Sequence, residues 1–236
     1  MLSRYKKLSE CELINYDPAQ EEVVQKLHKL HHDIEIHIIQ NSSSFFKKIF
    51  AAKEGIKIKG MYIYGDVGRG KSMLMDLFFD TSSVKKKRRV HFHAFMLEVH
   101  RTLHKWRRQE RYDEVDPIPP LAKEIAKNAK LLCFDEFQVT DIADAMIMGR
   151  LFAELFEQGV IVVATSNRSP DDLYKDGLQR ERFEPFIELL KSNVEVMKLD
   201  SEKDYRLSHL KSLSTVYFIA CGKEADNFLK ETFADL

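Results

Sequence analysis

Eight consecutive residues of this chain have the types and spacing of a loop that binds polyphosphate. They are Gly65-Asp66-Val67-Gly68-Arg69-Gly70-Lys71-Ser72, which fit the pattern G-x-x-x-x-G-K-[S/T] at every position. In such a loop the backbone N–H groups surround the phosphates, the lysine reaches the outer ones, and the hydroxyl is a ligand of Mg²⁺. We therefore expect Lys71 to contact a nucleoside triphosphate and Ser72 to hold Mg²⁺. The alternative is a glycine-rich turn that binds nothing.

The residues on either side of this loop favour the phosphate-binding interpretation. The apolar run 61–64 predicts a short buried strand, and the residues 72–79 predict a helix. A helix that begins at the end of the loop directs its free N–H groups and the positive end of its dipole at an anion.

A second group of candidate residues follows the apolar run 131–134. Asp135 and Glu136 come directly after this predicted strand. In a parallel sheet, ligands bind beyond the carboxyl ends of the strands, which is where this pair falls. We expect Asp135 to hold Mg²⁺ through a water molecule and Glu136 to orient and deprotonate the attacking water. A solvated turn is the alternative.

Three further candidates lie downstream. Asn167 ends a buried run that begins at residue 161, and its amide could position the water or the terminal phosphate; a helix cap at Ser166 or Asn167 is the alternative. Arg180 and Arg182 could supply a positive charge to a nucleotide bound by a neighbouring subunit. Solvated arginines, or pairing with Glu181 and Glu184, would explain them equally well.

Strands and helices are predicted to alternate along the chain, which indicates a parallel sheet covered by helices on both faces. We expect strands at 61–64, 90–95, 131–134, 160–164 and 194–199, and helices at 18–41, 45–53, 72–79, 96–111, 121–129, 142–158 and 183–191. We divide the chain into an N-terminal helical extension (1–54), an α/β nucleotide-binding core (55–200) and a C-terminal fragment (201–236).

Composition narrows the function classes. Lys and Arg total 37 and Asp and Glu total 37, so the balance of charge offers no general argument for a nucleic acid or membrane partner. The three cysteines are widely spaced, which points to a reducing cytoplasm, and no apolar run reaches the roughly 18 residues of a membrane span. We expect the cation run 85–89 to be a solvated loop, and His91 and His93 to share one face of a strand.

Several long segments resemble the ZapE/AFG-like family of AAA+ P-loop ATPases. The resemblance covers about residues 55–206, and the most distinctive segment is Phe134-Asp135-Glu136-Phe137-Gln138-Val139-Thr140-Asp141-Ile142. Other matching stretches are 60–78, 90–100, 164–168, 172–174 and 177–183.

This resemblance assigns roles to individual residues. It implies that Lys71 and Ser72 act in the Walker A motif, that Asp135 and Glu136 form the Walker B pair, and that Asn167 is the first sensor. Arg182 is then the preferred arginine finger and Arg180 the second choice.

The resemblance also implies a function. ATP and Mg²⁺ would be the cofactors, and ATP hydrolysis would drive work on a protein partner, with the bacterial cell-division ring as the candidate. Mitochondrial members are linked to protein quality control. Nucleic acid is not an expected partner.

The family's helical lid has no full counterpart in residues 201–236, since Arg206 is the last arginine of the chain. We therefore expect the lid to be missing or fragmentary, and self-assembly to need a lid supplied from elsewhere. Two other interpretations stay open, namely a nucleotide-binding interaction module that does not hydrolyse ATP and a small-molecule phosphotransferase.

Overall fold

The described part of the chain is built around a parallel sheet with strand order β2-β3-β4-β1-β5. The structure is a computed structural model, and it describes residues 1–11, 13–42, 58–108 and 116–201. All of these belong to one unit, Met1–Glu202. The strands are β1 (Gly60–Tyr64), β2 (Lys87–His91), β3 (Leu131–Asp135), β4 (Ile161–Ser166) and β5 (Val194–Lys198).

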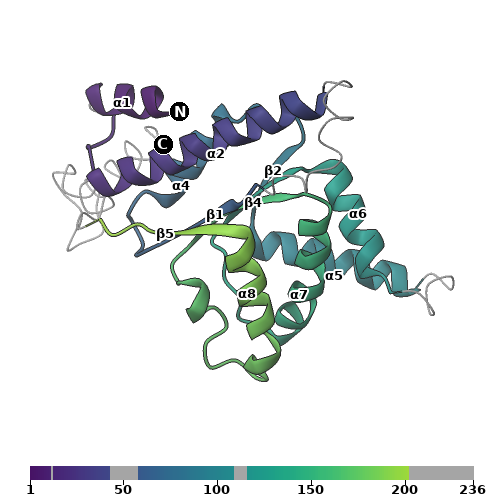
Figure 1. The fold of residues 1–236 in the computed structure, drawn as a ribbon. Helices are drawn as coiled ribbons and strands as arrows, with labels where there is room; N and C mark the ends of the chain where they lie inside the picture. The colour runs from purple at the N-terminus through teal and green to yellow at the C-terminus, as the bar shows by residue number, and fades with distance from the viewer. Residues whose placement is uncertain (12, 43–57, 109–115, 202–236) are drawn as a thin grey trace, which may run out of the picture. The chain divides into compact units, whose positions relative to one another are not determined.

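Helices cover both faces of this sheet (Figure 1). One face packs against α1 (Leu2–Glu10), α2 (Pro18–Ser42) and α4 (Lys71–Thr81). The other packs against α5 (Phe92–Arg108), α6 (Ile118–Asn128), α7 (Ile142–Glu157) and α8 (Glu184–Asn193). The predicted architecture, a parallel sheet between two helical layers, is confirmed.

Alternation along each strand explains why there are two apolar clusters. Met61 and Ile63 of β1 belong to the cluster under α2 and α4, whereas Tyr62 between them belongs to the cluster under α5 to α8. Successive side chains of a strand point to opposite faces, so an all-apolar strand such as β3 supplies both cores at once.

Local signals fix several helix ends. Pro18 opens α2, where its missing N–H costs nothing. The Asp141 carboxylate accepts a hydrogen bond from the Ala143 N–H and caps α7, and Gly159 takes φ +72° just after that helix ends. Helix α7 therefore starts at Ile142, seven residues beyond Asp135.

The sequence prediction for residues 85–95 was wrong. The strand is Lys87–His91, and α5 begins at Phe92, so His93 is helical and does not share a strand face with His91. Phe92, Phe95, Met96 and Val99 are buried with helical spacing, which outweighs the short alternation of residues 90–95.

Lys87, Arg88 and Arg89 are not a solvated loop either. Lys87 Nζ donates to the carbonyls of Phe79 and Ser82, and the two arginines form ion pairs with acidic side chains. The three cations of this edge strand are tolerated because each has a hydrogen-bond or ion-pair partner in the fold.

The predicted helix at 45–53 and residues 202–236 of the predicted C-terminal fragment 201–236, including Arg206, lie outside the described residues. In the part of the chain that the structure describes, none of the helices has the length and apolar character needed to cross a membrane.

Candidate nucleotide-binding and hydrolysis site

The eight-residue loop joins the end of β1 to the start of α4, as the sequence predicted. Gly70 takes φ +86° directly before the helix, a conformation that glycine adopts without strain. Ser72 is exposed in the first turn of α4. The loop thus ends at a helix N-terminus whose first N–H groups have no helical partner, which is the arrangement that binds anions.

Lys71 lies inside the loop that it closes. Its ammonium donates to the carbonyl oxygens of Gly65 and Asp66, each at 2.7 Å, and the residue is 8% exposed. A lysine held in this way carries its charge at the centre of the loop, where it would meet a phosphate surrounded by backbone N–H groups.

The N-terminal helices support the loop from outside. Gln20 of α2 donates from Nε2 to the Arg69 carbonyl at 3.0 Å, and its Oε1 accepts from the Tyr5 hydroxyl at 3.2 Å. Tyr5 and Gln20 are almost fully buried, and burial raises the pKa of Tyr5 to about 12, so its hydroxyl stays a donor. A Cβ at Gly70 would lie 2.6 Å from Gln20 Nε2, so any larger residue there would displace the end of the Gln20 side chain. Sequence reasoning did not find Gln20.

The carboxylate pair lies at the end of β3. Asp135 is buried, with 4% of its surface exposed, whereas Glu136 is exposed and has φ +53°. A glutamate rarely takes a left-handed conformation, and such strained residues cluster at functional sites. The turn directs two adjacent acids into different surroundings, one buried and one open to solvent.

Hydrogen bonds with the end of β4 hold the residues at the end of β3 in place. The Phe137 N–H donates to the Thr165 carbonyl at 2.7 Å, and the Ser166 hydroxyl donates to the Phe137 carbonyl at 2.8 Å. The Thr165 hydroxyl lies between the two acids, 3.5 Å from Asp135 Oδ1 and 3.4 Å from the Glu136 nitrogen. Since β4 lies between β1 and β3, these residues separate the loop from the carboxylates by one strand.

Asn167 is exposed directly after β4. It lines a cleft of about 510 Å³ together with Gly65 and Asp66, so the structure brings it beside the start of the loop. The buried Tyr62 hydroxyl donates to the Arg168 carbonyl at 3.0 Å and holds the following turn; burial raises the pKa of Tyr62.

The helix-cap alternative for Ser166 and Asn167 was wrong for the turn that follows. That turn, Pro170–Asp172, is capped by Ser169, whose hydroxyl accepts from the Asp172 N–H at 3.2 Å.

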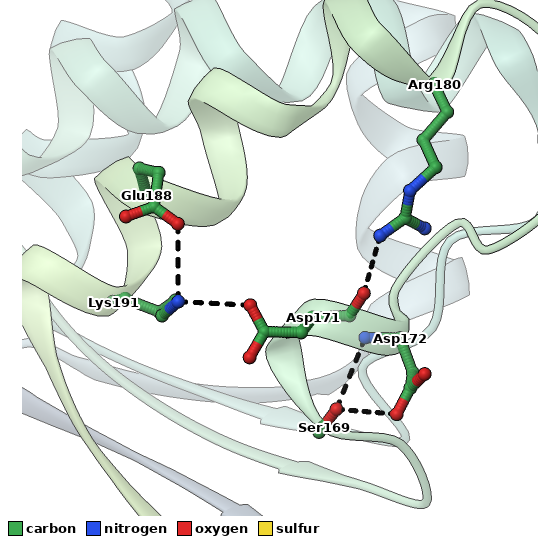
Figure 2. A network of polar contacts seen from close by, with 6 residues as sticks. All are labelled: Ser169, Asp171, Asp172, Arg180, Glu188 and Lys191. Carbon is green, nitrogen blue, oxygen red and sulfur yellow. Dashed lines mark hydrogen bonds and ion pairs between the residues drawn. The ribbon is translucent and has the colours of Figure 1, made fainter.

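The two candidate arginines have different surroundings. Figure 2 shows Arg180 beside the Asp171 carbonyl, which accepts from its guanidinium at 2.5 Å; the Leu173 carbonyl also accepts, at 2.9 Å. Lys191 bridges Asp171 and Glu188 in the same network. Arg180 therefore holds its own loop together through carbonyls, not through the neighbouring glutamates.

Arg182 is exposed, and among the residues that the structure describes its side chain makes no hydrogen bond or ion pair. The next residue, Phe183, is fully buried against Tyr174 and Phe186 and anchors the segment. Of the two arginines, Arg182 is the one whose guanidinium remains available to a second molecule.

Sequence reasoning also missed Arg89. Its Nε donates to Asp135 Oδ2 at 2.7 Å, and its guanidinium also pairs with Asp76 of α4. No spacing rule links residues 89 and 135, because the contact exists only once β2 and β3 are paired.

Comparison with known proteins decides the family. The AFG1-like ATPase family matches residues 1–236, the whole chain.

The chain belongs to the AFG1-like ATPase family.

Two curated relatives illustrate the similarity. Lactation elevated protein 1 homolog B of Danio rerio is 50% identical over 184 residues, which cover 75% of this chain and 37% of the relative. Cell division protein ZapE of Escherichia coli K12 is 45% identical over 166 residues, covering 69% of this chain and 43% of the relative. The chain thus spans less than half the length of these two AFG1-like relatives.

Among solved structures, domain III of the Thermotoga maritima replication initiation protein DnaA superposes with a TM-score of 0.53 at 15% identity. The match covers 80% of this chain and 65% of that structure. At this identity the likeness concerns the fold alone, an α/β fold built on a parallel sheet, as the sequence predicted.

Proposed function

We propose that this chain binds ATP with Mg²⁺ and hydrolyses it to do work on a protein partner. One observation carries the proposal: three neighbouring parallel strands, β1, β4 and β3, bring a phosphate loop, a polar strand end and a carboxylate pair to one edge of the sheet. Ligands of such sheets bind at this edge. Membership of the AFG1-like ATPase family supports ATP as the substrate.

The residues at this edge suit a magnesium nucleotide. The donors are a carboxylate, Asp135, and a hydroxyl, Ser72, and Mg²⁺ prefers oxygen ligands of this kind. Bound Mg²⁺ would neutralise charge on the phosphates. Lys71 and the first N–H groups of α4 would hold the phosphates, and Glu136 would orient and deprotonate the attacking water. Asn167 would position the terminal phosphate from the far side.

Two variants test the roles of Glu136 and Lys71. Glu136→Gln removes the base but keeps the shape, so we expect ATP binding to persist while turnover falls by about 10²- to 10⁴-fold. Lys71→Ala removes the charge inside the loop and should weaken binding itself. Calorimetry with ATP and a phosphate-release assay measure the two effects, with the exposed Lys123→Ala as the matched control.

Unchanged phosphate release by Glu136→Gln would remove Glu136 from the role of base. If the unmodified chain binds ATP without phosphate release across a series of protein concentrations, the non-hydrolysing interaction module is the better account.

The biological role extends this proposal. The name of the Escherichia coli relative refers to cell division, and we propose a partner in that process for this chain. Because the chain spans less than half of that relative, a pull-down should use a fusion of this chain with the remaining residues of such a relative. The fusion carries Glu136→Gln, which is expected to keep ATP bound. Recovery of the same proteins with Lys71→Ala would argue against nucleotide-dependent binding of the partner.

A further inference from the structure

Arg89 and Asp135 lie on neighbouring strands in a register that places them diagonally across from each other on one face of the sheet. Arg89 of β2 pairs with Cys133 of β3, and Asp135 is two residues further along β3, so the three side chains share one face of the sheet. Cys133 belongs to the cluster under α2 and α4, so this is the face that carries α4 and the phosphate loop. A diagonal pair of this kind is within reach of a long side chain.

The contacts of Arg89 extend in two directions. Its Nε donates to Asp135 Oδ2 at 2.7 Å, and its Nη1 pairs with Asp76 Oδ1. Asp76 lies four residues after Ser72, one turn further along α4. One guanidinium therefore joins the strand end that carries Asp135 to the helix that begins with Lys71 and Ser72.

The bond to Arg89 constrains the Asp135 carboxylate. Oδ2 accepts a hydrogen bond from Nε, whereas among the described residues Oδ1 has only the long contact with the Thr165 hydroxyl, at 3.5 Å. A buried carboxylate needs a compensating charge, and a guanidinium, which is planar, also fixes the direction of the carboxylate. The oxygen left less engaged is then held in one orientation.

We propose that Arg89 is a positioning residue for the magnesium nucleotide, acting through Asp135 and through the start of α4. This inference rests on the proposed function, since it assigns Arg89 a part in the same site. The positive charge of Arg89 disfavours a second cation nearby, whereas the orientation that Arg89 imposes on the Asp135 carboxylate favours Mg²⁺ binding. The effect of the orientation is the larger of the two.

The experiment measures how much Mg²⁺ tightens nucleotide binding. A fluorescent N-methylanthraniloyl derivative of ATP is titrated with each variant in Mg²⁺ and in EDTA. The quantity compared is the dissociation constant in EDTA divided by the dissociation constant in Mg²⁺. We expect Arg89→Gln and Arg89→Lys to reduce this ratio at least fivefold, while the constant in EDTA stays within twofold because the phosphate loop is untouched. Lysine keeps the charge but cannot make both contacts at once.

Two further variants separate positioning from folding. Arg88→Gln is the matched control, because Arg88 lies on the other face of β2 and pairs with Glu98 of α5; its ratio should equal that of the unmodified chain. Asp76→Asn removes only the ion pair between Arg89 and α4. Since the Asp76 side chain is half exposed, this change should lower the ratio to a smaller extent.

Each outcome has a defined meaning. A ratio for Arg89→Gln within twofold of the unmodified chain overturns the inference, and so does a raised ratio, which would mean that the charge of Arg89 dominates. A lowered ratio for Arg89→Lys, together with an unchanged thermal unfolding temperature of that variant, supports the inference. If the unmodified chain shows no Mg²⁺-dependent nucleotide binding, the proposed function fails and this inference falls with it.

Discussion

Gly65 is the residue where the phosphate loop touches the chain beyond β5. Its N–H donates to the Ser166 carbonyl at 3.3 Å, and the Leu199 N–H donates to the Tyr64 carbonyl at 2.7 Å. A Cβ at Gly65 would lie 2.4 Å from the Leu199 carbonyl oxygen, which is backbone and cannot move aside freely. The first glycine of the loop is thus required by close packing between two strand ends.

Replacing Gly65 therefore tests packing at the scale of one residue. We expect Gly65→Ala to lower the free energy of unfolding by roughly 3 kcal/mol, from the displaced Leu199 backbone and the strained φ together. Gly159→Ala is the control, because Gly159 also has a positive φ but a Cβ there would meet nothing within 4 Å; it should cost only about 1 kcal/mol. Urea denaturation measures both, and equal losses would contradict the steric explanation.

Helices α1 and α2 pack on the sheet and also reach the phosphate loop. Their buried side chains, such as Val23, Leu27 and Tyr5, join Met61 and Ile63 of β1 in one cluster. Gln20 adds a polar link from this layer to the Arg69 carbonyl. The segment that we predicted to be an extension therefore supports the nucleotide-binding core in its described part.

The link through Gln20 predicts a loss of stability at the scale of these helices. Gln20→Ala leaves the Arg69 carbonyl without its donor and the Tyr5 hydroxyl without one acceptor, and should cost about 2 kcal/mol. Gln25→Ala, the same change at an exposed site of α2, should stay within about 0.5 kcal/mol. Denaturation curves that coincide for the two variants would show that the buried link contributes nothing.

Elements whose sequence pattern is local were predictable, whereas elements stabilised by residues distant in sequence were not. Strands β1 and β3 were predictable because they are continuous apolar runs followed by polar residues, and α7 because its cap and its glycine stop are local. Strand β2 was predicted at 90–95 and not at Lys87–His91, because the cations at its start are stabilised by Asp135, Asp76 and Glu98, none of which is adjacent in sequence.

The same reasoning applies to the candidate site. The loop 65–72 and the pair Asp135-Glu136 are local patterns, and their positions at strand ends follow from the parallel sheet. Arg89 and Gln20 contact these patterns only through strand pairing and helix packing, so a single sequence contains no spacing that reveals them. The family resemblance already preferred Arg182 over Arg180, and the contacts of Arg180 with backbone carbonyls add a physical reason that sequence alone does not contain.

At the scale of the whole molecule, the exposed Arg182 raises the question of self-assembly. In the segment before it, Tyr174, Asp176 and Gln179 have positive φ values, and the Tyr174 hydroxyl donates to the Leu178 carbonyl at 3.0 Å. An exposed cation on an anchored segment suits contact with a nucleotide held by another subunit. We propose that role for Arg182.

Mixing two inactive variants tests whether Arg182 acts between subunits. Arg182→Ala keeps the phosphate loop, and Lys71→Ala keeps the arginine, so a mixture of the two should hydrolyse more ATP than the two measured separately. A mixture of Lys71→Ala with Glu136→Gln should show no such gain, because neither contributes a complete site. Activity of the first mixture equal to the sum of its parts would place Arg182 outside the neighbouring site.

The contacts of Gly65 have a consequence for the growing chain on the ribosome. Strand β1 is made early, yet both of its neighbours in the sheet, β4 and β5, are made much later, and the loop is tied to Ser166 and Leu199. Pairing between distant segments makes folding slow and leaves early strands exposed. The nucleotide-binding loop can therefore take its final shape only after residue 199 has left the exit tunnel, so nascent chains stalled before this point should not retain ATP.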